Sequence, residues 1–333
     1  MKNETEIMKA VVYRKYGPPD LLRVEEVKRP EPGRDDVLIR VRAAEATKGD
    51  CELRRFHFPV KWFWLPLRIG FGLWKPRRRI LGGYFSGEVA AVGSGVAKFR
   101  EGDAVFGCAG LRMGAYAEYI CLPAGRTIAP KPRNMSFEEA AAVPLGGLNA
   151  LHFLRRAGIK KGEKILINGA GGSIGTFGVQ IAKAMGGEVT TVDSGIKEAM
   201  LRRIGADHFF DYTREEITRC GRTYDVIFNI VAGSPYKKFV KMLNPGGRYL
   251  ISNPRLSDMF RSPLTSWFSD KKSIFALAGE TEAELLDLGG MIEEGKIRAA
   301  VDRVYPMSRA PEAHRRVETE QRLGIVVLSM DSL

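Results

Sequence analysis

The sequence predicts an α/β protein with two domains, a β-rich first domain and a second domain built on a doubly wound parallel sheet. Three observations support this prediction. The length of 333 residues is more than one ordinary domain holds. Short apolar–polar alternations broken by Gly and Pro fill residues 8–50 and 86–122, as in half-buried strands. After Pro132, continuous apolar runs alternate with helical patterns, as buried parallel strands and their crossover helices do.

The first domain should be a small barrel-like unit of short strands. The segments expected to form its strands are AVVYRKYG, LLRVEEV, DVLIRVRAA, SGEVAAVGSGV, the turn and strand KFREGDAVFG, and GAYAEYICLP. A helix is expected next, over MSFEEAAAVPLGGLNALHFLRRAGI. Ser136 should be its N-cap, with Glu138 and Glu139 in its first turn.

The second domain should alternate strands and helices. The expected strands are EKILING, EVTTVD, HFFDY, YDVIFNIV and RYLIS, and the expected helices are SIGTFGVQIAKAMG, GIKEAMLRRIGA and SPYKKFVKMLNPGG. The chain then adds the strand SIFALA, a helix from near Thr281 to Gly295, and the strand GIVVLSM. We therefore expect residues 8–130 together with 275–333 to form the first domain, and residues 131–274 to form the second.

The composition limits the classes of protein. Charged residues make up 27% and hydrophobic residues 44% of the chain, which argues against a membrane protein and against extensive disorder. The net charge of +13 favours anionic partners such as phosphates, nucleic acid or a membrane surface. The four cysteines form no C-x-x-C pair, so neither a disulfide framework nor a cysteine-rich zinc site is expected. With no apolar leader segment, we expect a cytoplasmic protein with reduced thiols.

The most specific motif is ILINGAGGSIGTFGVQIAKAMGGEVTTVD. Its first glycines lie between a predicted buried strand and an apolar-faced helix, where a Rossmann fold binds the pyrophosphate of a dinucleotide. Glycine allows the tight turn and the close approach of phosphate, and the N-terminus of the helix presents free N–H groups. We predict NAD(P)H as the cofactor, with contacts from Gly171, Gly172, Ser173, Ile174, Gly175, Asp193, Ser194, Lys197 and Tyr212.

The choice between NADH and NADPH stays open. Asp193 ends the second strand of the motif, where a carboxylate accepts ribose hydroxyls and repels a 2′-phosphate. Lys197 and Tyr212 favour the opposite choice, because a cation and a phenol suit a phosphate.

The chain resembles the medium-chain dehydrogenase/reductase superfamily, and within it the zinc-free, zeta-crystallin-like quinone oxidoreductase group. The resemblance runs from MKAVVYRKYGPPDLLRVEEV to GIVVL, and VPLGGLNALHFL, NGAGGSIGTFGVQIAKAMG, IGADHFFDYT and YDVIFNIV carry it in combination. It implies a GroES-like catalytic domain, a Rossmann domain and an active site in the cleft between them. It also implies a homodimer built through edge strands, for which SIFALA is the candidate.

The resemblance also allows the positions of the catalytic-zinc ligands to be compared residue by residue. The positions that match the catalytic-zinc ligands of other family members are Thr47, Gly83 and Leu145, none of which is a useful zinc ligand. Without a metal to acidify an alcohol, simple alcohol oxidation is disfavoured. Hydride transfer from NAD(P)H to a quinone or an α,β-unsaturated carbonyl needs no metal and becomes the expected activity. The alternative is a non-catalytic protein that keeps the fold and binds the cofactor, a membrane or RNA.

The sequence offers several candidates for the group that supplies the proton after hydride transfer. Relatives carry a Tyr before a Pro in the first domain, and Phe58 stands at that position, next to His57. Thr47 and Asp50 match an active-site segment of the family and are candidates to order a water, or else to cap a turn. Tyr84 is a third candidate catalytic residue, and Asn149 matches a polar position near the nicotinamide.

Residues 51–80 interleave aromatic and basic side chains, in CELRRFHFPVKWFWLPLRIGFGLWKPRRRI. The preferred interpretation is a lid over an apolar substrate pocket, lined by His57, Phe58, Trp62 and Trp64 and with its basic residues solvated. Contact with a membrane surface is the second interpretation, and nucleic-acid binding is the least favoured.

Overall fold

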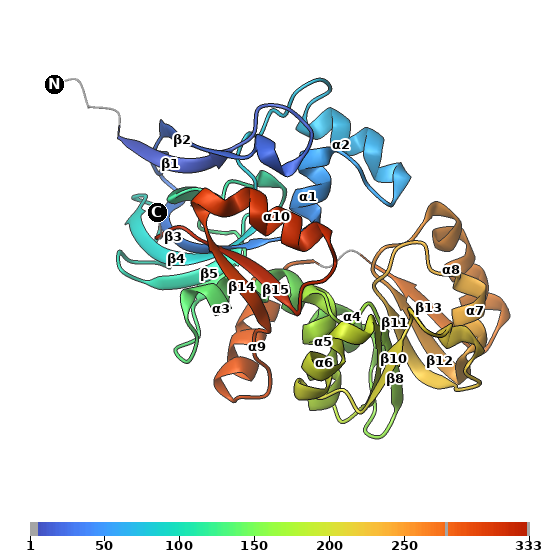
Figure 1. The fold of residues 1–333 in the computed structure, drawn as a ribbon. Coiled ribbons are helices and arrows are strands. Elements are labelled where there is room, and N and C mark those ends of the chain that lie inside the picture. The colour runs from blue at the N-terminus through green and yellow to red at the C-terminus, as the bar shows by residue number, and fades with distance from the viewer. Residues whose placement is uncertain (1–5, 277–278, 332–333) are drawn as a thin grey trace.

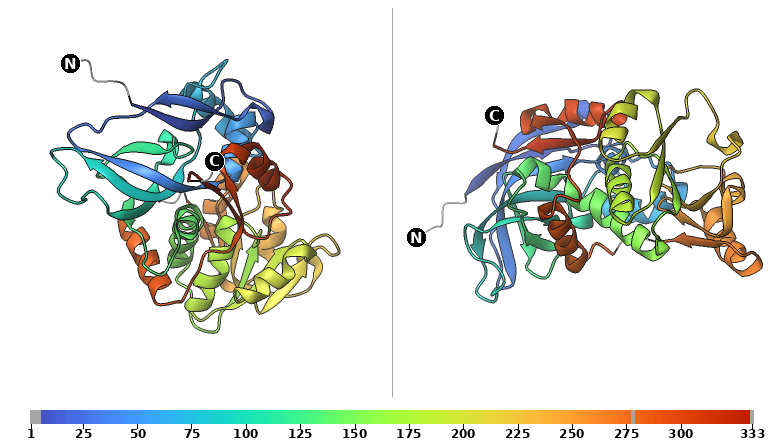
Figure 2. Two further views of the ribbon diagram at one scale, coloured as in Figure 1. Left: turned by 60° about the vertical axis from the view of Figure 1, so that its left-hand side comes forward. Right: turned by 90° about the horizontal axis from the view of Figure 1, so that it is seen from below.

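The computed structural model describes residues 6–276 and 279–331, and it contains two large sheets (Figure 1). A seven-stranded mixed sheet has the order β14-β15-β3-β4-β5-β7, and β6 also pairs with β3. A separate antiparallel hairpin, β1–β2, lies at the far end of the molecule from the second sheet in every view (Figures 1 and 2). The strands are β1 (Ile7–Val12), β2 (Arg23–Lys28), β3 (Asp36–Ala46), β4 (Tyr84–Val92), β5 (Ala104–Cys108), β6 (Tyr119–Pro123), β7 (Ile128–Pro130), β14 (Val301–Pro306) and β15 (Ile325–Ser329).

The second sheet is parallel throughout and has six strands in the order β10-β9-β8-β11-β12-β13. In chain order this is 3-2-1-4-5-6, the doubly wound arrangement that the sequence predicts. The strands are β8 (Lys164–Asn168), β9 (Glu188–Asp193), β10 (His208–Asp211), β11 (Tyr224–Asn229), β12 (Leu243–Ile251) and β13 (Lys272–Phe275). The predicted fold class is therefore confirmed.

The helices connect and cover these sheets. They are α1 (Lys48–Arg55), α2 (Trp64–Phe71), α3 (Phe137–Ala141), α4 (Val143–Ala157), α5 (Ser173–Ala184), α6 (Glu198–Arg203), α7 (Tyr236–Lys241), α8 (Leu256–Phe268), α9 (Glu282–Glu293) and α10 (Ala310–Glu318). Single turns of 3-10 helix lie at Pro19–Leu21, Lys61–Phe63, Gly110–Arg112, Gly195–Lys197, Ile217–Arg219 and Met307–Arg309. Within the described residues, none of the helices has both the length and the apolar character needed to cross a bilayer.

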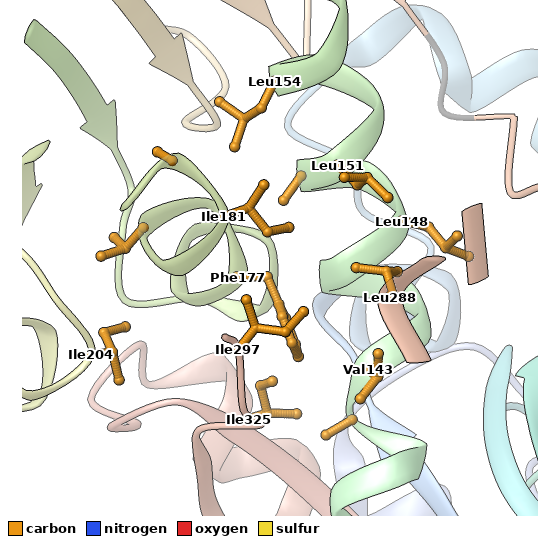
Figure 3. Close-up of a cluster of buried hydrophobic side chains, with 14 of the residues drawn as sticks. Val143, Leu148, Leu151, Leu154, Phe177, Ile181, Ile204, Leu288, Ile297 and Ile325 are labelled. Atoms are coloured by element: carbon orange, nitrogen blue, oxygen red, sulfur yellow. The ribbon is translucent and has the colours of Figure 1, made fainter. Parts of the chain in front are cut away.

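One buried cluster joins the two sheets. Val143 and Leu151 of α4 lie with Phe177 of α5 and Ile325 of β15 in the same apolar core (Figure 3). A second core fills the first domain around Tyr116. Since β13 belongs to the parallel sheet and β14 and β15 to the mixed sheet, the chain returns to the first domain between them. The domain boundaries at residues 130 and 275 stay a prediction.

Local structure differs from the expectation at several places: the helix expected after Pro132 divides into α3 and α4, and α1, α2, β14 and α10 were not expected. Two further differences lie in the second domain. The helix expected over SPYKKFVKMLNPGG ends at Lys241, and β12 begins at Leu243. Pro245 has no N–H to continue a helix, and Gly246 adopts a φ of +71°. Helix α8 has no counterpart among the expected elements. Its buried residues include the polar Asp258 and Ser262, whereas its large apolar side chains face outwards, the reverse of the usual pattern.

Candidate functional site

The carboxyl ends of β8, β9 and β11 meet at the switch point of the parallel sheet, where such folds bind their ligands. A cavity of about 400 Å³ opens there, within the range of small-molecule sites. Its lining combines backbone of the glycine turn with charged side chains from distant parts of the chain. The lining residues are Asn168, Gly169, Gly172, Val192, Asp193, Lys197, Tyr212, Ile230, Val231, Glu320 and Arg322.

The glycine turn is shaped by close approaches that only glycine permits. A Cβ on Gly175 would lie 2.5 Å from the backbone of Ala170, and one on Gly171 would lie 2.3 Å from Cδ of Lys197. Gly172 is the N-cap of α5 and faces the cavity, so the free N–H groups at the start of this helix are available to an anion. The turn has the shape expected for a pyrophosphate site.

Arg322 is buried beside this turn, and the charges that act on it over a longer range are those of Glu45 and Glu320. Its side chain lines the cavity, and Nη2 lies 3.7 Å from the position of a Cβ on Gly172. The residue is 5% exposed, and neither Nε nor Nη1 has a hydrogen-bond partner among the described residues. A buried guanidinium without a partner is costly, which indicates an anion as its missing partner. The residues at the turn therefore fit the pyrophosphate of a dinucleotide.

Asp193 organises the other end of the cavity. One of its oxygens accepts a hydrogen bond from Gly171 N (2.7 Å), and the other accepts from Ser194 N (2.8 Å) and pairs with Lys197 Nζ (2.9 Å). Both Asp193 and Lys197 are buried, so Lys197 neutralises the carboxylate on which the sequence-based argument for NADH rests. Tyr212 is exposed at the rim, and partial burial raises the pKa of its hydroxyl.

Three of the predicted cofactor residues have other contacts. Ser173, the first residue of α5, donates from Oγ to Oε1 of Glu45 on β3 (2.5 Å), which joins the two domains. Ile174 packs against the shared core. Asn149 lies within α4 and donates from Nδ2 to the carbonyl of Leu145 (2.9 Å).

Thr47 and Asp50 form a capping box at the start of α1. Thr47 donates from N (3.0 Å) and from Oγ1 (2.6 Å) to the Asp50 carboxylate, and Asp50 N donates back to Thr47 Oγ1 (2.9 Å). The carboxylate also accepts from Gly82 N (3.0 Å) and from the hydroxyl of Tyr116 (3.1 Å). Burial raises the pKa of Asp50, although these donors oppose the shift. The pair thus fastens α1 to the loop before β4.

Tyr84, at the start of β4, has its hydroxyl fixed by an acidic residue. The hydroxyl donates to Oε1 of Glu280 (2.7 Å), and the Glu280 carbonyl accepts from the hydroxyl of Thr127. Burial, and secondarily the charge of Glu280, raise the pKa of Tyr84 well above its ordinary value. Tyr84 therefore keeps its proton at neutral pH.

The four residues predicted to line a substrate pocket lie outside the dinucleotide cavity. His57 is exposed, and Phe58 packs edge-on against Phe56. Trp62 donates from Nε1 to the carbonyl of Pro254 (3.4 Å), just before α8, so this segment reaches the second domain. Trp64 is half-exposed at the start of α2.

The basic residues of this segment are not all solvated. Arg54 is fully buried and forms an ion pair with Glu318, with a further hydrogen bond to the Gly17 carbonyl (3.1 Å). A buried charge needs its partner close by. These contacts of Arg54 therefore hold α1 within the packed first domain.

Arg322, Glu320 and Glu45 are not among the site residues predicted from the sequence. Arg322 and Glu320 belong to no motif and reach the cavity only through the return of the chain before β15. Glu45 could have been recognised from the sequence, because it is an acidic residue inside the apolar stretch AAEA. It is fully buried, Oε2 has no hydrogen-bond partner among the described residues, and burial raises its pKa to about 8.

A metal site of the usual composition is not found within residues 6–276 and 279–331, where no three His, Cys, Asp or Glu side chains could hold an ion together. The three positions compared with zinc ligands do not fit zinc either. Thr47 caps α1, and Gly83 and Leu145 have no donor side chain.

Two family models match the chain. The alcohol dehydrogenase GroES-like domain matches residues 33–133, and the zinc-binding dehydrogenase model matches residues 204–328. Among curated proteins, the chain is 31% identical to the chloroplastic NADPH-dependent alkenal/one oxidoreductase of Arabidopsis thaliana, across 96% of this chain and 79% of that protein. It is 30% identical to a quinone oxidoreductase of Pseudomonas aeruginosa, across 96% and 99% of the two chains.

A solved structure agrees with these relatives. The quinone oxidoreductase from Coxiella burnetii superposes with a TM-score of 0.85 at 29% identity and covers 98% of this chain and 100% of its own.

Proposed function

Because the chain belongs to the medium-chain dehydrogenase/reductase superfamily, in its zeta-crystallin-like quinone oxidoreductase group, we propose that it transfers hydride from NAD(P)H to a quinone or an α,β-unsaturated carbonyl. The observation that carries its dinucleotide-binding part is the buried guanidinium of Arg322 beside the glycine turn, of which Nε and Nη1 have no hydrogen-bond partner among the described residues. When bound, the reduced nicotinamide supplies the hydride. Gly172 and Arg322 would hold the pyrophosphate, and Asp193 with Lys197 would hold the adenosine ribose.

In this proposal the reaction does not use zinc. The donor set at Thr47, Gly83 and Leu145 supports it, because none of these side chains ligates zinc well. A quinone or an enone is already electron-poor, so hydride addition does not require a Lewis acid on the acceptor.

We assign the acceptor side of the site to the first domain, with Thr47, Asp50 and Tyr84 as its candidate residues. Thr47 and Asp50 hold the start of α1, and Tyr84 is held by Glu280. These contacts support a positioning role, and solvent would then supply the proton. His57, Phe58, Trp62 and Trp64 remain the proposed lid residues. The contact of Trp62 with Pro254 supports this, since a segment linked to both domains can control entry between them.

We also propose a homodimer and a cytoplasmic location. Strand β13 is the last strand in the order of the parallel sheet, so its outer edge is open to a second copy. The predicted strand SIFALA overlaps β13 at residues 273–275, and its last two residues lie outside the described residues. The outward apolar side chains of the neighbouring helix α8, including Phe260 and Trp267, support burial in such an interface. The four cysteines are all free, as expected for a reducing compartment.

The decisive experiment is steady-state oxidation of NADH and of NADPH by the purified protein with a panel of quinones and enones. We expect turnover with at least one acceptor class, and loss of turnover in Gly171→Val, whose side chain would collide with Lys197. Dinucleotide binding without turnover on any acceptor would support the non-catalytic alternative instead.

A further inference from the structure

Helix α2 is apolar on two opposite faces. Leu67 and Phe71 face inwards and pack against the core of the first domain. Leu65 and Ile69, one helical turn apart, face outwards and are 59% and 58% exposed. A helix that is apolar on both faces is usually buried on both, so α2 lacks a partner on its outer face.

Further exposed apolar side chains lie at the two ends of the helix. Trp64 precedes Leu65, and Leu73 and Trp74 follow the helix, with Trp74 91% exposed. We name the exposed side chains of Trp64, Leu65, Ile69, Leu73 and Trp74 the α2 patch. Figure 1 shows α2 at the top of the first domain, on the side nearer to the second domain. Large exposed apolar side chains concentrated in one short segment often mark an interaction site.

The surroundings of the α2 patch carry one sign of charge. Residues 53–87 contain eight Lys or Arg and no Asp or Glu. Six of these cations are exposed: Arg55 pairs with Glu318, and the other five are Lys61, Lys75, Arg77, Arg78 and Arg79. None of these five takes part in the ion pairs found across the described part of the chain. The partner of the patch should therefore be apolar within and anionic at its surface.

The patch is held in place before any partner arrives. The hydroxyl of Tyr16 donates to the carbonyl of Gly72 (2.9 Å), and the guanidinium of Arg68 lies over the ring of Phe56 (4.3 Å to its centre). These contacts fix α2 to the domain, so docking does not require the helix to be ordered first.

We propose that the α2 patch docks on the surface of an anionic lipid bilayer. The aliphatic side chains of Leu65, Ile69 and Leu73 would enter the boundary of the acyl chains, and Trp64 and Trp74 suit the headgroup level. The cations from Lys75 to Arg79 would lie among anionic headgroups. The helix lies on the membrane in this arrangement and does not cross it.

Two other occupants fit the same surface less well. A second copy in a two-fold dimer would place the same cations against each other, with no carboxylate from residues 53–87 to compensate. Single-stranded nucleic acid stacks its bases on aromatic rings. The aliphatic side chains of Leu65, Ile69 and Leu73 provide no aromatic face on which a base could stack.

The test is co-sedimentation of the full chain with vesicles of phosphatidylcholine and phosphatidylserine, and with vesicles of phosphatidylcholine alone. We expect binding to the anionic vesicles that weakens with salt. Leu65→Gln/Ile69→Gln should reduce the partition coefficient at least about tenfold. The matched control is Leu111→Gln/Leu286→Gln, at positions 64% and 48% exposed elsewhere, and should not change it.

The charge is tested separately. Lys61→Gln/Lys75→Gln should weaken binding to anionic vesicles about 25-fold, since each basic residue near an anionic surface contributes about fivefold. Lys160→Gln/Lys161→Gln removes the same charge in the turn before β8 and should have little effect. All variants should bind dinucleotide as the wild type does.

Three results would overturn the proposal. The first is no sedimentation of the wild type with anionic vesicles. The second is an equal loss of binding in the patch variants and their controls. The third is binding to another partner through the patch, seen either as RNA binding in fluorescence anisotropy or as a change of oligomeric state in Leu65→Gln/Ile69→Gln.

Discussion

Replacing Arg322 with Met separates a ligand-binding role of this residue from a structural one. Methionine has a similar length but no charge, so it fills the space and removes the donors. Hydrogen bonds to a charged group contribute about 1.5–3 kcal/mol. Loss of the guanidinium should therefore weaken dinucleotide binding by about 10–150-fold.

The stability of the free protein should respond in the opposite sense. Nε and Nη1 of Arg322 have no hydrogen-bond partner among the described residues, so their desolvation is uncompensated without the dinucleotide. Arg322→Met should therefore leave the Tm of the free protein unchanged or raise it by about 2 °C. In the presence of saturating dinucleotide the wild type should gain more stability than the variant.

Calorimetric titration with dinucleotide and thermal unfolding with and without it would measure both effects. Arg126→Met removes an exposed arginine elsewhere and is the matched control. Arg322→Lys keeps the charge without the planar fork and should lie between the wild type and Met. A fall in Tm of the free protein with unchanged dinucleotide affinity would show that Arg322 serves the fold, and the argument for the phosphate site would fail.

Three further predictions follow from the same cavity and from the donor set. Asp193→Ser should raise the ratio of kcat/KM for NADPH to that for NADH at least about tenfold, because it removes a carboxylate and frees Lys197 from its ion pair. An unchanged ratio in steady-state kinetics would show that the 2′-hydroxyl of the adenosine ribose binds elsewhere. The pKa of Glu45 rises from 4.5 to about 8 on folding, so the folded state holds the extra proton between these values and loses stability as pH rises through them. Denaturant unfolding across this pH range should show that loss in the wild type and a flatter profile in Glu45→Gln, and equal slopes would contradict the burial argument. Chelation with EDTA should not change turnover, and elemental analysis should find less than one zinc per chain; activity that disappears with the metal would refute the zinc-independent proposal.

The elements that could be predicted are those that depend on a short stretch of neighbouring residues. The glycine turn between β8 and α5 follows from the strand, turn and helix that surround it, and Ser136 does cap α3 in a reciprocal box with Glu139. Helix α8 was not predicted, although Leu256, Phe260 and Leu264 recur at helical spacing. Pro263 lies inside this segment, and proline argues against a helix interior. The pattern does not reveal that the polar face is the buried one, where Ser262 donates to the Ser273 carbonyl (2.9 Å).

The candidate site could be predicted less completely than the fold, because several of its residues come from distant parts of the chain. Arg322 reaches the glycine turn from a loop far along the chain, and no local pattern of residues records that approach. The contact between Glu45 and Ser173 likewise joins two domains whose arrangement has to be known first. Thr47 and Asp50 have sequence spacing that suits both an active-site role and a helix cap, and the structure shows the cap. Their role in turnover remains a proposal.

The pairing of β15 with β3 has a consequence for how the protein is made. Val326 lies opposite Ala46, so the mixed sheet joins strands from the two ends of the described chain. The parallel sheet, in contrast, uses residues 164–275 without interruption. During synthesis the parallel sheet can form from neighbouring βα units as they leave the ribosome, whereas the mixed sheet has to wait for β15. Arg322 arrives with that same strand. A nascent chain can therefore hold a folded second domain and still lack the guanidinium beside Gly172, so tight dinucleotide binding should begin only once the first domain has closed.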